Sequence, residues 1–196
     1  MSKTVDFYYD FGSPTAYLAY KRLQQFLAQY DFKLNYKPIL LGGVFKATGN
    51  TTPVAVPAKG TYMLEHDLPR FAKRFGVPLN FNPHFPINTL GLMRGAIAAE
   101  RLDCLARYVD VVYDAVWVAG ENMGEPEVIA RVLAAADLDS EALMTLSQDP
   151  EVKAELIKNT EEAVERGAFG APTIYVQGEM YFGQDRLDFV EEALAG

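Results

Sequence analysis

Cysteine and histidine are scarce in this sequence of 196 residues, which contains Cys104, His66 and His84 and no others of either type. A single cysteine excludes an intrachain disulfide and a dithiol redox pair. Because Cys104 lies in an apolar stretch of helical pattern, we interpret it as a buried, inert thiol rather than a nucleophile. The two histidines lack the spacing of metal ligands, so we expect no metal site.

Positive charge is scarce as well, with 18 Lys and Arg against 26 Asp and Glu and a formal net charge of -8. This charge repels nucleic acids and anionic membranes at long range, so we expect neither as a partner. No apolar run approaches the length of a membrane span, and the N-terminal residues lead into a strand pattern without an apolar signal region. We therefore expect a cytoplasmic protein, and its 49% hydrophobic residues suit one globular core.

The two ends of the chain carry different strand and helix patterns. Near the N-terminus, a β-rich run at 5–9 precedes an apolar stripe of helical period at 14–30 and a short alternating strand around 34–36. Near the C-terminus, two β-rich runs at 173–176 and 179–182 predict a hairpin, which a helix over 184–194 follows.

The middle of the chain has repeated helix signals and no convincing strand. Helices are expected at 62–75 with a break or kink at Pro69, at 88–101 with Asn88 as cap, at 105–120, and from Pro126 and Pro150 onward. A β-α-β half separated from a β-β-α half is the thioredoxin arrangement. We predict an α/β thioredoxin-like fold, formed by residues 1–37 and 167–196, with a long all-helical domain, residues 38–166, inserted between the two halves.

A sharp strand-to-helix junction at residues 10–14 (Asp-Phe-Gly-Ser-Pro) is the most informative local feature. Ser13 suits an N-cap, and Pro14 suits the first helical position. The free N-H groups and the helix dipole at such a junction attract an anion, including a thiolate. Taken alone, an ordinary helix start explains the same pattern.

A second signal places Pro172 at the start of a predicted strand. In a thioredoxin-like fold, Ala-Pro-Thr at this position carries a cis peptide bond and faces the helix N-terminus of Ser13. The backbone of Ala171 would then pair with an extended peptide. A trans proline at the entry to a strand is the alternative.

A third signal opens the final helix at residues 182–187 (Phe-Gly-Gln-Asp-Arg-Leu). The backbone N-H groups of Gln184 and Asp185 are able to receive a carboxylate, and the Asp185 side chain is able to receive an ammonium group. Together they would form a receptor for an amino-acid head group. A carboxylate that merely caps the helix is the alternative for Asp185.

These three segments resemble the 2-hydroxychromene-2-carboxylate isomerases, which belong with the kappa-class glutathione transferases in the disulfide-oxidoreductase superfamily. The resemblance covers essentially the whole chain. Three further segments match: residues 38–50, residues 57–60 and residues 82–90. The first contains the run Leu-Gly-Gly-Val-Phe-Lys-Ala-Thr-Gly-Asn, and the last reads Asn-Pro-His-Phe-Pro-Ile-Asn-Thr-Leu. One departure is Ala16, where several relatives place a second serine.

The resemblance implies glutathione as cofactor and Ser13 as the catalytic residue that hydrogen-bonds its sulfur. The cofactor-binding residues it implies are Ser13, Lys46, Asn50, Lys59, Ala171, Pro172, Gln184 and Asp185. Lys46 and Lys59 would act from a glycine-rich loop, with solvated surface lysines as the alternative. His84 and Phe85 are candidates for the substrate pocket, with a structural histidine as the alternative.

The implied reaction interconverts 2-hydroxychromene-2-carboxylate and trans-o-hydroxybenzylidenepyruvate, a step in the breakdown of naphthalene-like aromatics. Reversible addition of the glutathione thiolate would turn a conjugated double bond into a rotatable single bond. A small aromatic carboxylate is therefore the expected substrate, and the resemblance also implies a homodimer. A kappa-type glutathione transferase or peroxidase, and a non-catalytic glutathione-binding module, remain alternatives.

Overall fold

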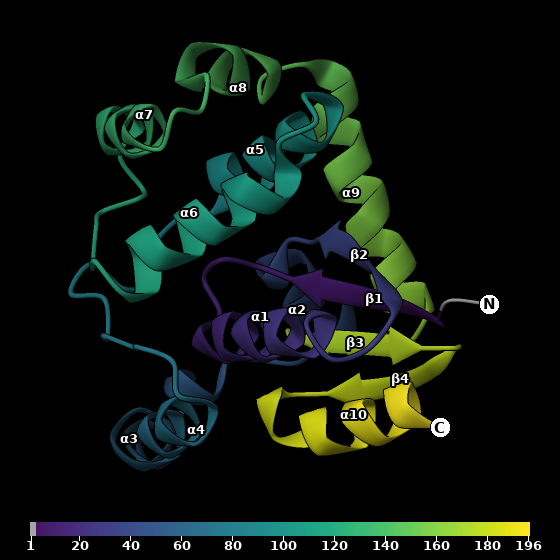
Figure 1. Cartoon of the computed structure of the whole chain (residues 1–196). Helices are drawn as coiled ribbons and strands as arrows, with labels where there is room; N and C mark the ends of the chain where they lie inside the picture. The colour runs from purple at the N-terminus through teal and green to yellow at the C-terminus, as the bar shows by residue number, and fades with distance from the viewer. Residues whose placement is uncertain (1–2) are drawn as a thin grey trace.

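The structure of the protein is a computed structural model that describes residues 3–196. The expectation that no apolar signal region precedes the first strand rests in part on residues 1–2, which lie outside this range. A four-stranded sheet in the order β2-β1-β3-β4 lies at the centre (Figure 1). Its strands are β1 (Lys3–Tyr9), β2 (Phe32–Pro38), β3 (Thr173–Val176) and β4 (Glu179–Phe182). β1 pairs parallel with β2 and antiparallel with β3, and β3 pairs antiparallel with β4. The predicted thioredoxin-like α/β fold is confirmed.

Alternate residues of β1 face two different hydrophobic clusters. Val5, Phe7 and Tyr9 belong to the main core, whereas Tyr8 belongs to a smaller cluster on the other face of the sheet. This alternation follows from the two-residue period of a strand. Helices α1 and α10 contribute to the main core, and α2 and the end of α9 contribute to the smaller cluster, so helices cover both faces.

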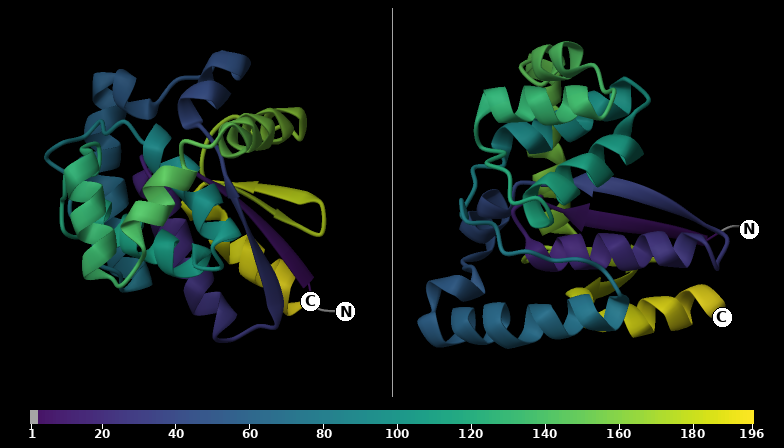
Figure 2. Two further views of the ribbon diagram at one scale, coloured as in Figure 1. Left: turned by 90° about the horizontal axis from the view of Figure 1, so that it is seen from above. Right: turned by 60° about the vertical axis from the view of Figure 1, so that its left-hand side comes forward.

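The chain between β2 and β3 is mainly helical. Its helices are α2 (Leu41–Thr48), the 3-10 turn Pro53–Ala55, α3 (Pro57–Tyr62), the π-helical turn Met63–Asp67, α4 (Leu68–Phe75), α5 (Leu90–Arg101), α6 (Leu105–Trp117), α7 (Pro126–Ala135), α8 (Ser140–Leu146) and α9 (Pro150–Glu165). Helices α5 to α8 gather at one end of the molecule, and α3 and α4 lie at the other end, near α10 (Figures 1 and 2). Within residues 3–196, no helix combines the length and apolar character that a bilayer crossing requires.

Two remaining elements flank the central sheet in sequence. Helix α1 (Pro14–Leu27) follows β1 and ends three residues before the predicted end. The 3-10 turn Gln184–Arg186 follows β4 and leads into α10 (Leu187–Ala195), which together occupy the predicted final helix. We retain as a proposal the division into a thioredoxin-like domain, residues 1–37 and 167–196, and an inserted helical domain.

The glycine-rich loop expected to carry Lys46 and Lys59 instead contains helices α2 and α3. Gly43 lies within α2, where a Cβ atom would come 3.2 Å from Cγ2 of Thr160 on α9. The glycine therefore lets α2 approach α9 closely, and the backbone N-H of Leu40 donates to the Thr160 hydroxyl at 3.0 Å. Tertiary packing against α9 explains why this segment is helical despite its glycines.

Pro69 does not break the helical segment at 62–75. The chain passes from α3 through the π-helical turn directly into α4, where Pro69 lies in the first turn. Proline cannot donate an N-H to the preceding turn, and the wider π-helical turn accommodates that loss.

Candidate active site

Ser13 caps the N-terminus of α1, as predicted. Its backbone is extended, with φ -100° and ψ 112°, and its hydroxyl oxygen accepts the N-H of Ala16 at 3.1 Å. The residue is 5% exposed. The helix backbone thus holds the hydroxyl oxygen, while the hydroxyl proton is free to point to another acceptor.

The peptide bond between Ala171 and Pro172 is cis, as expected from the second local signal, and the trans alternative is wrong. The Ala171 carbonyl lies beside the start of α1, where it accepts the Ser13 hydroxyl at 3.0 Å and the Thr15 hydroxyl at 3.2 Å. The two local signals at Ser13 and Ala171 therefore meet in one site, although they come from opposite ends of the chain.

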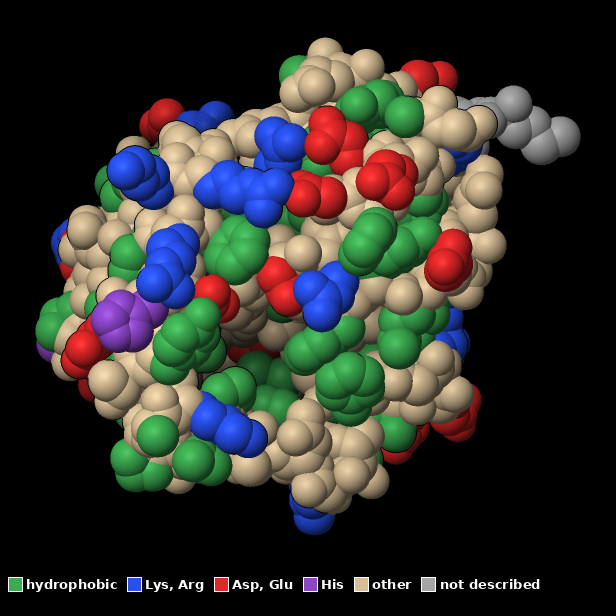
Figure 3. All heavy atoms as spheres, turned by 90° about the horizontal axis from the view of Figure 1, so that it is seen from below, with side chains coloured by type: hydrophobic (Ala, Val, Ile, Leu, Met, Phe, Trp, Pro, Cys, Tyr) green, Lys and Arg blue, Asp and Glu red, His purple; other side chains and the backbone are tan. Residues whose placement is uncertain are grey.

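A cleft of about 670 Å³ opens beside Ser13. Figure 3 shows a hollow in this face of the molecule, with hydrophobic side chains along its rim and acidic and basic side chains around it. The cleft brings together predicted site residues from six separate segments: Ser13, Asn50, Lys59, Phe85, Ala171, and Gln184 with Asp185.

Three predicted site residues are absent from the described residues that line the cleft: Lys46, His84 and Pro172. Lys46 is exposed in the last turn of α2 rather than in a loop. His84 is exposed, and its backbone N-H donates to Oδ1 of Asn82 at 2.8 Å. Pro172 is buried, so it acts on the site through the position of Ala171.

Asp67 and Thr15 are polar residues of the cleft that were not identified from the sequence, and neither were the aromatic residues Phe45, Phe169 and Phe182. Asp67 lies in the π-helical turn, and its Oδ2 accepts the Nε2 amide of Gln184 at 3.3 Å. The Thr15 hydroxyl lies 2.9 Å from the Ser13 hydroxyl. Thr15 could have been identified from the sequence, because it is a second hydroxyl residue two positions after Ser13. No local pattern marks Asp67, because its contact with Gln184 joins distant segments of the chain.

Aromatic side chains form part of the cleft wall. Phe169 and Phe182 lie with ring centroids 4.4 Å apart and are 37% and 38% exposed. Phe45 lines the same cleft, and a Cβ atom on Gly170 would come 3.0 Å from Cε2 of Phe182. The glycine therefore lets the Phe182 ring lie close to the backbone at residue 170. The three rings together offer an apolar surface to a flat ligand.

Charged residues of both signs line the cleft. The cation is Lys59, and the carboxylates are Asp67 and Asp185, so an anionic and a cationic group of one ligand can each find a partner. The Asp185 carboxylate accepts Nη1 of Arg186 at 2.6 Å and stays exposed. An ammonium ligand would share Asp185 with this guanidinium.

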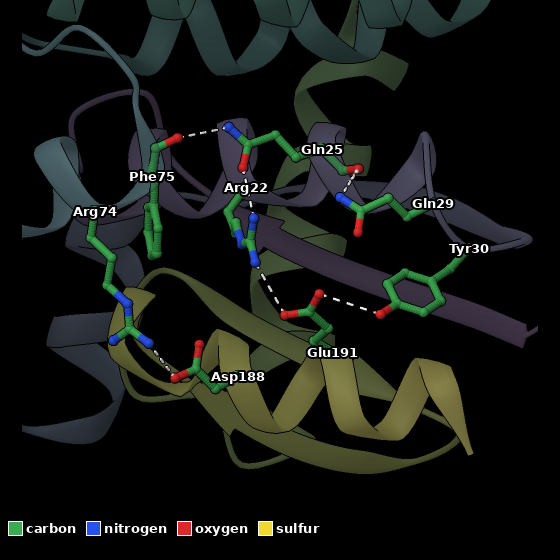
Figure 4. A network of polar contacts seen from close by, with 8 residues as sticks. All are labelled: Arg22, Gln25, Gln29, Tyr30, Arg74, Phe75, Asp188 and Glu191. Atoms are coloured by element: carbon green, nitrogen blue, oxygen red, sulfur yellow. Dashed lines mark hydrogen bonds and ion pairs between the residues drawn. The ribbon is translucent and has the colours of Figure 1, made fainter.

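Ion pairs hold the helices on either side of the cleft (Figure 4). Arg74 at the end of α4 pairs with Asp188 on α10 at 2.7 Å, and Arg22 on α1 pairs with Glu191 on α10 at 3.1 Å. The Nε2 amide of Gln25 on α1 donates to the backbone at the end of α4 at 2.8 Å. These contacts connect the helical segment that carries Asp67 and Lys59 with the segment that follows Asp185.

Asp10 lies beneath the junction and is 3% exposed. Its Oδ1 accepts the N-H of Gly12 at 2.9 Å and the hydroxyl of Thr89 at 2.7 Å, and its Oδ2 accepts the N-H of Leu41 at 2.9 Å. Burial raises the pKa of the Asp10 carboxyl, and the three hydrogen bonds lower it by less. This carboxyl therefore joins the loop before Ser13 to the starts of α2 and α5.

Comparison with known proteins agrees with this geometry. The model of the DsbA-like thioredoxin domain family matches residues 4–195. The chain is 32% identical over 197 residues to the 2-hydroxychromene-2-carboxylate isomerase of Sphingobium xenophagum, and the match covers 99% of each protein. It is 29% identical over 212 residues to glutathione S-transferase kappa 1 of Homo sapiens, and this match covers 99% of the chain and 92% of the transferase. A solved 2-hydroxychromene-2-carboxylate isomerase matches 98% of this chain and 94% of its own with a TM-score of 0.89 at 32% identity. The chain is therefore an enzyme of the 2-hydroxychromene-2-carboxylate isomerase family, built on a DsbA-like thioredoxin domain.

Proposed function

We propose that the protein is a glutathione-dependent isomerase that interconverts 2-hydroxychromene-2-carboxylate and trans-o-hydroxybenzylidenepyruvate, or a close aromatic enone-pyruvate, in aromatic hydrocarbon catabolism. The observation that carries the proposal is the Ser13 hydroxyl at the N-terminus of α1 inside the cleft. The single cysteine, Cys104, precedes α6 and is not among the described residues of the cleft. A thiol for this junction therefore has to come from a bound molecule.

The described residues fit glutathione by charge and by volume. Lys59 suits a carboxylate, and Asp67 and Asp185 suit an ammonium group. A cleft of about 670 Å³ lies within the range of about 300 to 1,000 Å³ that is typical of small-molecule sites. We propose cofactor contacts with Ser13, Asn50, Lys59, Ala171, Gln184 and Asp185. Because Lys46 lies outside the cleft, we assign the carboxylate contact to Lys59.

Ser13 acts on the ionisation of a thiol by donating its hydroxyl proton to the sulfur. A free thiol with a pKa near 8.5 is about 3% ionised at pH 7, and lowering that pKa by two units takes about 2.7 kcal/mol. The helix dipole contributes about 0.3 to 2 kcal/mol, and a hydrogen bond to a charged group contributes about 1.5 to 3 kcal/mol. The N-terminus of α1 and Ser13 together reach the required free energy.

Bound glutathione would supply a thiolate that adds reversibly to the conjugated double bond, so that the bond can rotate before the thiolate leaves. The chain's own part is to hold the aromatic ring near this point. Phe45, Phe169 and Phe182 line the cleft together with Phe85, and we propose that they bind the ring of the substrate.

The test is isomerisation of each of the two compounds by the purified protein, with and without glutathione, followed by ultraviolet absorbance. We expect both directions to reach the same mixture only when glutathione is present, and the thiol content to stay constant. A kappa-type transferase would instead consume glutathione with chlorodinitrobenzene. Retention on immobilised glutathione without turnover of any enone would indicate a binding module.

We also propose a homodimer, as the resemblance to the isomerase family implies, and a cytoplasmic location, as expected from the sequence. Light scattering coupled to gel filtration measures the mass in solution against the chain mass of 21.8 kDa. A mass near that of one chain would contradict the dimer.

A further inference from the structure

Three oxygen atoms form a closed triangle at the start of α1. The Ser13 and Thr15 hydroxyl oxygens are 2.9 Å apart, and they lie 3.0 Å and 3.2 Å from the carbonyl oxygen of Ala171. Ser13 is 5% exposed and Ala171 is 9% exposed, whereas Thr15 is half-buried, so the contact between Ser13 and Ala171 is the shielded side of the triangle. Each hydroxyl has a single proton, so two protons serve three short contacts.

The proton count limits what Ser13 can do alone. Its oxygen already accepts the N-H of Ala16, and its one proton can point either to the Ala171 carbonyl or to a ligand in the cleft. If that proton turns to a ligand, the buried Ala171 carbonyl loses the Ser13 hydrogen bond, which is unfavourable unless another donor replaces it. The residue after Ala171 is Pro172, which has no N-H to offer. A bound peptide that pairs with the Ala171 backbone would fill one of the two acceptor positions of this carbonyl oxygen, and the other position would still attract the Ser13 proton unless Thr15 occupies it.

We infer that Thr15 is a positioning residue, whose hydroxyl satisfies the Ala171 carbonyl and so frees the Ser13 proton to hydrogen-bond a thiolate. Thr15 reaches the same carbonyl oxygen at 3.2 Å from the first turn of α1. With Thr15 present, the Ala171 carbonyl keeps a donor while Ser13 donates into the cleft. This inference rests on the proposed use of glutathione, and it concerns a hydrogen-bond exchange in which no covalent bond changes.

The test compares Thr15→Val, which keeps the branched shape and loses the hydroxyl, with Thr15→Ser, which keeps the hydroxyl. Ultraviolet absorbance of the thiolate is titrated with pH in the presence of glutathione. We expect Thr15→Val to raise the apparent pKa of the bound thiol by about 0.5 to 1 unit, and Thr15→Ser to titrate like the wild type. Thr145→Val, an exposed change on α8, is the matched control and should titrate like the wild type.

Two further measurements separate ionisation from simple loss of shape. Binding of S-methylglutathione, which has no ionisable thiol, should be unchanged in Thr15→Val. The kcat/KM for isomerisation should fall several-fold at neutral pH and approach the wild-type value at high pH, where the thiol ionises unaided. If thermal melting shows that Thr15→Val does not fold, Thr15→Ala takes its place.

An unchanged titration in Thr15→Val would overturn the inference, and so would equal shifts in Thr15→Val and Thr15→Ser. In either case the wild type still shows a thiolate and turnover, so the proposed function stands. If the wild type itself shows no thiolate absorbance with glutathione, the proposed function fails, and the role of Thr15 fails with it.

Discussion

The hydroxyl of Ser13 lies 3.0 Å from the carbonyl oxygen of Ala171, a residue 158 positions later in the chain. The contact exists because β1 and β3 are neighbours in the sheet, so the segments that adjoin them reach the same edge. Neither the helix start nor the cis proline forms a site by itself. Their contact surrounds one hydroxyl proton with the acceptors that determine its direction.

Ser13→Ala should lower kcat/KM at neutral pH by about tenfold to a hundredfold or more, because the thiol loses its hydrogen-bond donor. The variant should also lose about 1 kcal/mol of stability, because the hydroxyl caps α1. Asp139→Ala is the matched control: Asp139 caps α8 by accepting the N-H of Ala142 at 3.0 Å, away from the cleft. The Asp139→Ala variant should lose a similar amount of stability and keep the wild-type kinetics. Unchanged kinetics in Ser13→Ala would remove Ser13 from the mechanism.

Lys59→Ala should weaken retention on glutathione, because Lys59 is the lysine that lines the cleft. We expect the dissociation constant to rise about three- to tenfold, the size of one exposed charged contact. Lys46→Ala removes the same charge from the exposed end of α2 and should bind like the wild type. Isothermal titration with glutathione measures both, and an equal loss in the two variants would indicate a general effect of charge.

Asp185→Ala should weaken glutathione binding by about tenfold, because the proposed receptor loses a carboxylate that faces the ammonium group. Glu127→Ala removes an exposed carboxylate from the first turn of α7, away from the residues that line the cleft. This control should change the affinity little. Binding by Asp185→Ala as tight as that of the wild type would eliminate the head-group receptor.

Two glycines of α5 should respond oppositely to alanine. A Cβ atom on Gly95 would come 2.8 Å from Cζ of Tyr108, a fully buried side chain whose hydroxyl donates to the carbonyl of Leu92. Gly95→Ala should therefore cost about 1 to 3 kcal/mol of unfolding free energy through overpacking. Gly91→Ala has open space around the new Cβ and should stabilise by about 0.5 to 1 kcal/mol. Urea denaturation measures both, and a stabilised Gly95→Ala would contradict the packing at Tyr108.

The buried Asp10 predicts a pH dependence of stability. Burial raises the pKa of its carboxyl above the ordinary value of 3.8, so the folded protein binds this proton more tightly than the unfolded chain does. The stability linked to this proton is present below pH 3.8 and is lost as pH rises through the folded pKa. Relative to Asp10→Asn, the wild type should lose unfolding free energy across that range in a series of urea titrations. Parallel profiles would show that Asp10 keeps an ordinary pKa.

Local patterns in the sequence were sufficient for several elements of the fold and the site. The runs at 173–176 and 179–182 are the bounds of β3 and β4, because β-branched and aromatic residues around a turn define a hairpin locally. Ser13 was recognisable as a cap because its hydrogen bond reaches only to Ala16, three residues away. Such interactions depend on neighbours in the chain, so spacing alone reveals them.

Tertiary structure decided which residues share the cleft. Lys46 and Lys59 looked equivalent in the sequence, but α2 holds Lys46 outside the cleft and α3 holds Lys59 at its wall. Asp67 meets Gln184 across 117 positions, and the Ala171 carbonyl lies beside both Ser13 and Thr15 only because β3 pairs with β1. Spacing along the chain encodes the period of helices and strands, whereas contacts between distant segments depend on how the buried faces of those elements pack together.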